Sequence, residues 1–165
     1  ATVINGMAMR GALEEAGLRA RLFSAVPAGS AAEPYSPRAA LAALAAGEVG
    51  IFSGGTGCAF VSTDTAARLR ACDIGADAVL KATKVDGIYT ADPKKEPTAD
   101  FIPEIEVNDL LALDLADLAV ERAMLHALAR ARSVKEVFII NGREPGNLTR
   151  ALAGENPGTR IYRQA

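Results

Sequence analysis

Five side chains that suit a phosphorylated nucleotide fall within one short stretch, residues 79–93. They are Lys81, Thr83, Lys84, Tyr89 and Asp92. The apolar run 78–80 predicts a buried strand, and Asp86-Gly87 predicts a tight turn in which glycine adopts a positive φ. Ligands of open α/β sheets bind past the carboxyl ends of strands, where two cations would meet phosphates and a carboxylate would meet a ribose. A β-hairpin with solvated lysines explains the same residues, because short motifs carry a high false-positive risk.

A second candidate site is the glycine-rich stretch Gly54-Gly55-Thr56-Gly57, between a predicted strand and a predicted helix. Glycines let the backbone approach a ligand, and backbone N–H groups beside a helix N-terminus suit anions. The lysine of a Walker A motif is absent, so the stretch is not a P-loop. A simple tight turn remains the alternative. A helix is predicted to follow this stretch, with Thr63 or Asp64 as its N-cap.

Strands that alternate with helices must position these residues. Apolar alternation and turn signals predict strands and helices in turn along the whole chain, with one single domain over residues 1–165. Such alternation predicts an α/β fold, a three-layer αβα sandwich with a mostly parallel central sheet. The predicted strands are 19–24, 48–53, 77–81, 136–141 and 158–162, the first four in one sheet. The predicted helices are 2–16, 36–47, 63–73, a short one from Asn108, 116–132 and 147–153.

Composition and charge exclude several classes of protein. The net charge of −2 provides no basic field for nucleic acid, so no nucleic-acid partner is expected. Cys58, Cys72 and His126 are scattered too widely for a zinc site, and no metal-ligating residues are assigned. No apolar run approaches the roughly 20 residues that cross a membrane, so no membrane partner is expected. The protein is expected to be cytoplasmic, and a disulfide between the two cysteines is therefore not expected.

Four blocks of the sequence carry a resemblance to a known family. The run Lys81-Ala-Thr-Lys-Val-Asp-Gly-Ile-Tyr-Thr-Ala-Asp-Pro93 resembles the ATP-side signature of the amino acid kinase superfamily, and specifically of bacterial UMP kinases. The run Gly55-Thr-Gly-Cys-Ala-Phe-Val-Ser-Thr-Asp-Thr-Ala-Ala67 resembles their UMP-binding loop. Asn5–Arg10 is similar to a helix of the same kinases, and 145–159 to their C-terminal helix and strand. The order of the blocks is that of the UMP kinase branch.

The resemblance implies a reaction and a set of roles. The reaction is transfer of the γ-phosphoryl group of ATP to UMP, in pyrimidine nucleotide biosynthesis, with Mg²⁺ as cofactor and a homo-hexamer as the assembly. Asp64 and Lys81 are the implied catalytic residues. The implied ATP contacts are Thr83, Tyr89 and Asp92. The implied UMP contacts are Thr56, Gly57, Cys58, Ala59, Phe60, Val61, Ser62 and Thr63.

Two departures from the family pattern keep alternatives open. Cys58-Ala59 stands where UMP kinases carry Asn-Pro, and the segment 116–154 is similar to the molybdenum storage protein, a non-enzymatic relative that binds ATP. The first strand and the Gly-Gly-Gly loop of the kinases are not found, so the chain is expected to be N-terminally truncated, and such a fragment could be inactive. A non-catalytic nucleotide-binding storage protein is one alternative. Another kinase of the superfamily, acting on a carboxylate or carbamate, is the other.

Overall fold

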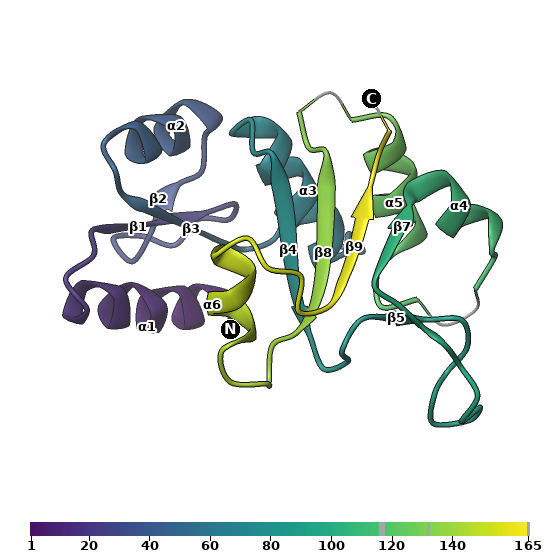
Figure 1. Cartoon of the computed structure of the whole chain (residues 1–165). Coiled ribbons are helices and arrows are strands. Elements are labelled where there is room, and N and C mark those ends of the chain that lie inside the picture. The colour runs from purple at the N-terminus through teal and green to yellow at the C-terminus, as the bar shows by residue number, and fades with distance from the viewer. Residues whose placement is uncertain (116–117, 132, 165) are drawn as a thin grey trace. The chain divides into compact units, whose positions relative to one another are not determined.

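The computed structural model describes residues 1–115, 118–131 and 133–164, in which helices alternate with strands as the sequence predicts (Figure 1). Contacts within the chain divide it into two compact units, Ala1–Ile74 and Gly75–Ala165. The expectation of one single domain over residues 1–165 stays a prediction. None of the helices in the described ranges has the length and apolar character needed to span a bilayer.

The first unit is an αβα arrangement around a three-stranded parallel sheet. Its elements are α1 (Thr2–Glu15), β1 (Ala20–Ser24), β2 (Glu33–Pro34), α2 (Pro37–Ala45), β3 (Val49–Ser53) and α3 (Thr63–Asp73). The strand order is β2-β1-β3, and β1 runs parallel to both neighbours. Figure 1 shows α1 on one side of this sheet and α2 on the other. The alternation of side chains along β1 therefore divides the core into two layers.

Each layer of that core has its own cluster of apolar side chains. Leu22 points to the α1 side, where it packs with Ile51 and Val3. The next residue, Phe23, points to the α2 side and packs with Ala40 and Ala43. Because successive strand residues face opposite ways, one strand supplies both cores.

The second unit contains a four-stranded mixed sheet with the order β4-β8-β9-β7. Its elements are β4 (Ala78–Thr83), β5 (Ile88–Tyr89), β6 (Phe101–Ile102), β7 (Glu104–Glu106), α4 (Val107–Ala112), α5 (Arg122–Ala129), β8 (Glu136–Asn141), α6 (Asn147–Leu152) and β9 (Thr159–Tyr162). The pairs β4–β8 and β7–β9 are parallel, and β8–β9 is antiparallel. The core of this unit is formed by the buried side chains of Leu110, Leu125, Leu128, Val137, Ile139, Ile140 and Ile161.

The pairing of strands differs from the sequence-based expectation in two places. The four strands expected in one sheet form two parallel pairs in separate ladders, β1 with β3 and β4 with β8. β4 and β5 do not form the hairpin that the Asp86-Gly87 turn allowed, because β5 pairs antiparallel with β6. The prediction that the apolar run 78–80 forms a buried strand is also wrong in part, because β4 is a strand whose residues are half-buried or exposed. An apolar run predicts a strand but does not identify its hydrogen-bonding neighbour or how far that neighbour covers it.

Three predicted helix starts can be compared with the structure. Ser36 caps α2 as expected, since its Oγ accepts a hydrogen bond from the Ala39 N–H at 3.2 Å. The cap of α3 is Ser62 rather than Thr63 or Asp64, and the cap of α4 is Glu106 rather than Asn108. The helix predicted over 116–132 is α5, which is shorter, and 116, 117 and 132 lie outside the described residues.

Candidate functional site

The loop between β3 and α3, residues 54–62 (the 54–62 loop), begins with a turn that only glycine can form easily. Gly54, Gly55 and Gly57 adopt φ values of 76°, 60° and 80°, and the Gly57 N–H donates to the Gly54 carbonyl at 3.0 Å. A Cβ on Gly57 would lie 2.8 Å from the carbonyl oxygen of Ala25. The turn therefore needs glycine both for its backbone conformation and for its close approach to the end of β1.

Two side chains from other elements hold this turn. The Gly54 N–H donates to Thr2 Oγ1 at 3.1 Å, and Arg70 Nη2 donates to the Gly55 carbonyl at 3.1 Å. The far end of the loop is held by Ser62, whose Oγ accepts from the Thr65 N–H at 3.4 Å. The loop is thus fixed at both ends by α1 and α3.

The predicted UMP residues form the exposed middle and the end of this loop. Thr56 is half-buried, and its Oγ1 accepts from the Cys58 N–H at 3.2 Å. The side chains from Cys58 to Val61 are exposed, and Phe60 is fully exposed with a positive φ of 61°. The predicted UMP residues thus lie along the 54–62 loop with its exposed tip, except Thr63, which is the first residue of α3.

Asp64 lies in the first turn of α3, two residues after the Ser62 cap. A carboxylate there interacts favourably with the positive end of the helix dipole. It is half-buried, and its assignment as a catalytic group stays a prediction. The prediction that Asp64 also caps the helix is wrong, because Ser62 already occupies that position.

In the second unit, Lys81 and Thr83 come from the carboxyl end of β4. Both are half-buried, and together with Lys84 they line a pocket of about 550 Å³. The Thr83 hydroxyl lies 2.9 Å from the Val85 carbonyl and accepts from the Val85 N–H at 3.2 Å, which shapes the turn after the strand. This is the position past a parallel strand where α/β folds bind ligands.

Arg143, which the sequence analysis did not single out, lines the same pocket. Its backbone N–H donates to Asn141 Oδ1 at 3.0 Å, and Asn141 Nδ2 donates to Asp86 at 2.8 Å. Asn141 therefore joins the end of β8 to the turn after β4. In the sequence, Arg143 is recognisable only as a cation that follows the predicted strand 136–141. It becomes informative once the structure pairs β8 with β4, because this pairing brings Arg143 to the same strand ends as Lys81.

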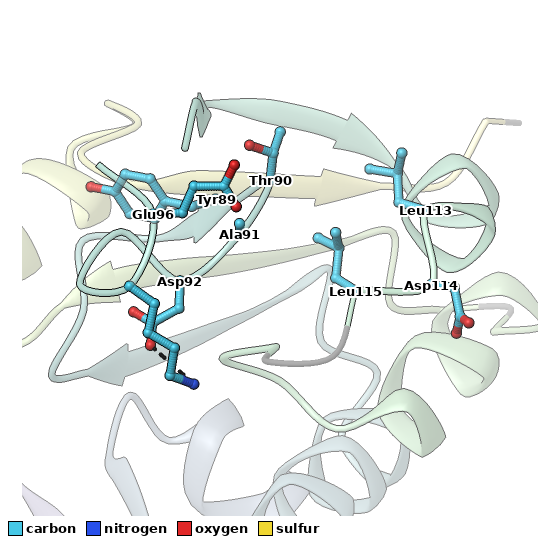
Figure 2. Close-up of a pocket in the computed structure, with 9 residues that line it drawn as sticks. Tyr89, Thr90, Ala91, Asp92, Glu96, Leu113, Asp114 and Leu115 are labelled. Carbon is cyan, nitrogen blue, oxygen red and sulfur yellow. Dashed lines mark ion pairs between the residues drawn. The ribbon is translucent and has the colours of Figure 1, made fainter. Parts of the chain in front are cut away.

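Tyr89 and Asp92 line another pocket of the second unit, of about 350 Å³ (Figure 2). Tyr89 is the last residue of β5 and Asp92 lies on the segment that follows, and Figure 2 shows both near Leu113 and Leu115, which follow α4. The Tyr89 ring packs edge-on against Phe101, with centroids 5.2 Å apart. The pocket thus combines an aromatic side chain and aliphatic side chains with polar groups, a mixture that suits a nucleoside. The charged side chains that line it are Asp92, Lys95, Glu96 and Asp114.

The Asp92 carboxylate is held in its ionised form. Oδ1 accepts a hydrogen bond from the Lys94 N–H at 3.0 Å, and Oδ2 lies 3.5 Å from Lys95 Nζ. The backbone hydrogen bond from Lys94, with the Lys95 contact, holds the pKa of Asp92 below its ordinary value. An ionised carboxylate is a hydrogen-bond acceptor only, and a ribose hydroxyl can donate to it.

The predicted residues thus form two groups. The UMP-side loop and Asp64 belong to the first unit, and Lys81, Thr83, Tyr89 and Asp92 belong to the second. The pairing of Asp64 with Lys81 around one transferred group stays a prediction.

Comparison with known proteins identifies the family. The model of the amino acid kinase family matches residues 1–141. The chain belongs to the amino acid kinase family. It is similar to solved UMP kinases from Bacillus anthracis (TM-score 0.89, 32% identity, 99% of this chain and 66% of that one) and Ureaplasma parvum (0.88, 28%, 98% and 68%). This likeness confirms the α/β fold class predicted from the sequence.

The chain is also similar to curated proteins named uridylate kinase. The chain is 45% identical to the uridylate kinase of Photorhabdus laumondii, over 99% of this chain and 66% of the relative. It is 46% identical to that of Serratia proteamaculans, over 98% and 65%. The chain thus spans slightly less than two thirds of the length of these relatives. The assignment of particular residues to UMP or ATP is not tested by these likenesses.

Proposed function

We propose that this amino acid kinase is a uridylate kinase, which transfers the γ-phosphoryl group of ATP to UMP and releases ADP and UDP. The observation that carries the proposal is the 54–62 loop. It is fixed at both ends and open at its tip, in a chain 45% identical to a uridylate kinase. The compared relatives share that name, which favours the kinase over a storage protein.

In the proposed reaction, an oxygen of the UMP phosphate bonds to the γ-phosphorus while the bond to the β-phosphate oxygen of ATP breaks. Little covalent chemistry falls to the protein, so catalysis is mainly positioning and charge stabilisation. Lys81 would stabilise the charge on the transferred group, and Asp64 would hold the cations around it. Lys84 and Arg143, at the same pocket as Lys81, would add positive charge beside the phosphates.

ATP would lie along the second unit. Tyr89 and the aliphatic side chains of the pocket in Figure 2 would contact the base, and Asp92 the ribose. Thr83 would fix the turn beside the phosphates. Among the described residues, no cluster of three or more His, Cys, Asp or Glu side chains could hold a metal. Mg²⁺ bound chiefly by substrate phosphates needs no such cluster, and there it would neutralise phosphate charge.

The homo-hexamer, the cytoplasmic location and the place in pyrimidine nucleotide biosynthesis belong to the proposal through the resemblance alone. The test uses the full-length protein and measures ADP formation with UMP, CMP, AMP or a glutamate-like acid as acceptor. We expect UMP to give the highest kcat/KM. Nucleotide binding without turnover would favour a storage protein, and turnover with a carboxylate or carbamate would favour another kinase of the family.

A further inference from the structure

Arg70 reaches from the last turn of α3 back to the start of the loop that precedes the helix. Its Nη2 donates to the Gly55 carbonyl at 3.1 Å. Only 15% of its side chain is exposed. A side chain this well covered has lost most of its freedom, so the bond to Gly55 is made from a fixed position.

Two partners within the first unit hold the Arg70 guanidinium. Its central carbon lies 3.6 Å from the centroid of the Tyr35 ring, and Nη1 lies 3.3 Å from Asp73 Oδ2. The Tyr35 hydroxyl donates to the same Asp73 oxygen at 2.6 Å. The arrangement uses both the flat face and the fork of a guanidinium, which lysine cannot reproduce.

The bond to Gly55 matters because of where it lies in the loop. Gly55 has a φ of 60°, and a Cβ there would meet nothing within 4 Å. Packing on that side therefore does not fix the orientation of the peptide. The next residues run into the exposed tip, from Cys58 to Val61. The direction of the Gly55 carbonyl sets the path of the chain into that tip.

The charge of Arg70 is already partnered by Asp73, so a role in positioning fits better than direct binding of a phosphate. We propose that Arg70 is a positioning residue, which acts through the Gly55 carbonyl to hold the 54–62 loop in the conformation that receives the acceptor nucleotide. The inference rests on the proposed function for the identity of that nucleotide.

The matched substitutions are Arg70→Lys and Arg68→Lys in the full-length protein. Both keep the charge and lie on α3, but positions two apart point to different sides of a helix. Tyr35→Phe keeps the ring beneath the guanidinium and removes only the hydroxyl bond to Asp73. For Arg70→Lys we expect KM for the acceptor to rise roughly 10- to 100-fold, the factor for losing one charge-assisted hydrogen bond, with KM for ATP little changed. Arg68→Lys should leave both values unchanged, and Tyr35→Phe should give a smaller rise.

A second readout does not depend on catalysis. Phe60 is fully exposed at the loop tip, so chymotrypsin can cut after it, and the rate depends on how well the loop is held. We expect fragments that end at Phe60, measured by mass spectrometry, to appear faster in Arg70→Lys than in Arg68→Lys. Circular dichroism and the melting temperature should show both variants folded.

The two readouts separate the possible failures. If the wild-type protein turns over no UMP, the proposed function is overturned. Faster cutting in Arg70→Lys would in that case still support the positioning role. The other failure requires a wild-type protein that is active. If Arg70→Lys then leaves either the cutting rate or the KM for the acceptor unchanged, the positioning role of Arg70 is overturned.

Discussion

The substitution Gly87→Ala tests whether this glycine serves close packing rather than an unusual backbone conformation. Gly87 is not among the glycines with positive φ, contrary to the turn predicted from Asp86-Gly87. A Cβ on it would instead lie 2.4 Å from Thr159 Oγ1 and 2.7 Å from the Phe101 ring. Both distances are below any ordinary contact of a Cβ, so Thr159 or the backbone must move.

The cost follows from what Thr159 does. It is fully buried, and its Oγ1 accepts from the Ile88 N–H at 2.8 Å and donates to the Ile102 carbonyl at 2.6 Å. Overpacking a tight site costs about 1–3 kcal/mol, and a buried donor left without its partner costs a similar amount. We therefore expect Gly87→Ala to lower the free energy of unfolding by roughly 2–3 kcal/mol.

The matched control is Gly11→Ala, on the interior of α1. A Cβ there meets nothing within 4 Å, and its φ is ordinary, so the same chemical change should stabilise the protein by about 0.5–1 kcal/mol. Urea unfolding of the full-length variants measures both changes, and hydrogen exchange of the Ile88 amide reports the local one. If Gly87→Ala stayed within about 0.5 kcal/mol of wild type with a protected Ile88 amide, the packing argument would fail.

Three further predictions concern the site and the stability of the sheet. Asp64→Asn should lower kcat roughly 10²- to 10³-fold with little change in KM for UMP, and full turnover in that variant would remove Asp64 from the mechanism. Cys58→Asn should raise the preference for UMP over CMP in kcat/KM, and an unchanged ratio would show that this position does not read the base. The hydrogen bond from Arg160 lowers the pKa of Glu136 from its ordinary value of 4.5. This hydrogen bond therefore stabilises the folded state fully above pH 4.5, and the stabilisation is lost as the pH falls through the lower pKa of the folded state. Melting temperatures measured from neutral to acidic pH should therefore fall more steeply for wild type than for Glu136→Gln, and parallel curves would contradict this.

The sequence was informative where one residue type has one local role. Ser36-Pro37 combines a cap with the ring that suits the first helical position, and α2 begins there. The run Glu136–Asn141 is apolar enough to be recognised as β8 with the bounds that the structure shows. In both cases the physical cause is local, so no knowledge of distant residues is needed.

Prediction from the sequence failed where two neighbouring residues could play the same role. It also failed where the role of a residue depends on a contact with a residue far away in the chain. Ser62 and Asp64 are both good cap residues, and the structure places Ser62 at the cap, with its side chain accepting from the Thr65 N–H. Gly87 is needed because of Thr159, and nothing near Gly87 in the sequence reveals that neighbour. Arg70 was not predicted for the same reason, since its partners Tyr35 and Gly55 come from other elements.

The structure also shows why the departure at Cys58-Ala59 need not disturb the loop that carries it. The residues that fix the shape of the loop are the glycines of its first turn, Thr2, Arg70 and the Ser62 cap. Cys58 takes part through its backbone N–H, which bonds to Thr56, while its side chain and that of Ala59 are exposed. A change of side chain at these two positions therefore alters what the tip presents to a ligand without removing a contact that holds the loop. Recognition of the base and the conformation of the loop are then separable, so Cys58→Asn should change nucleotide preference while the rate of chymotrypsin cutting after Phe60 stays that of wild type.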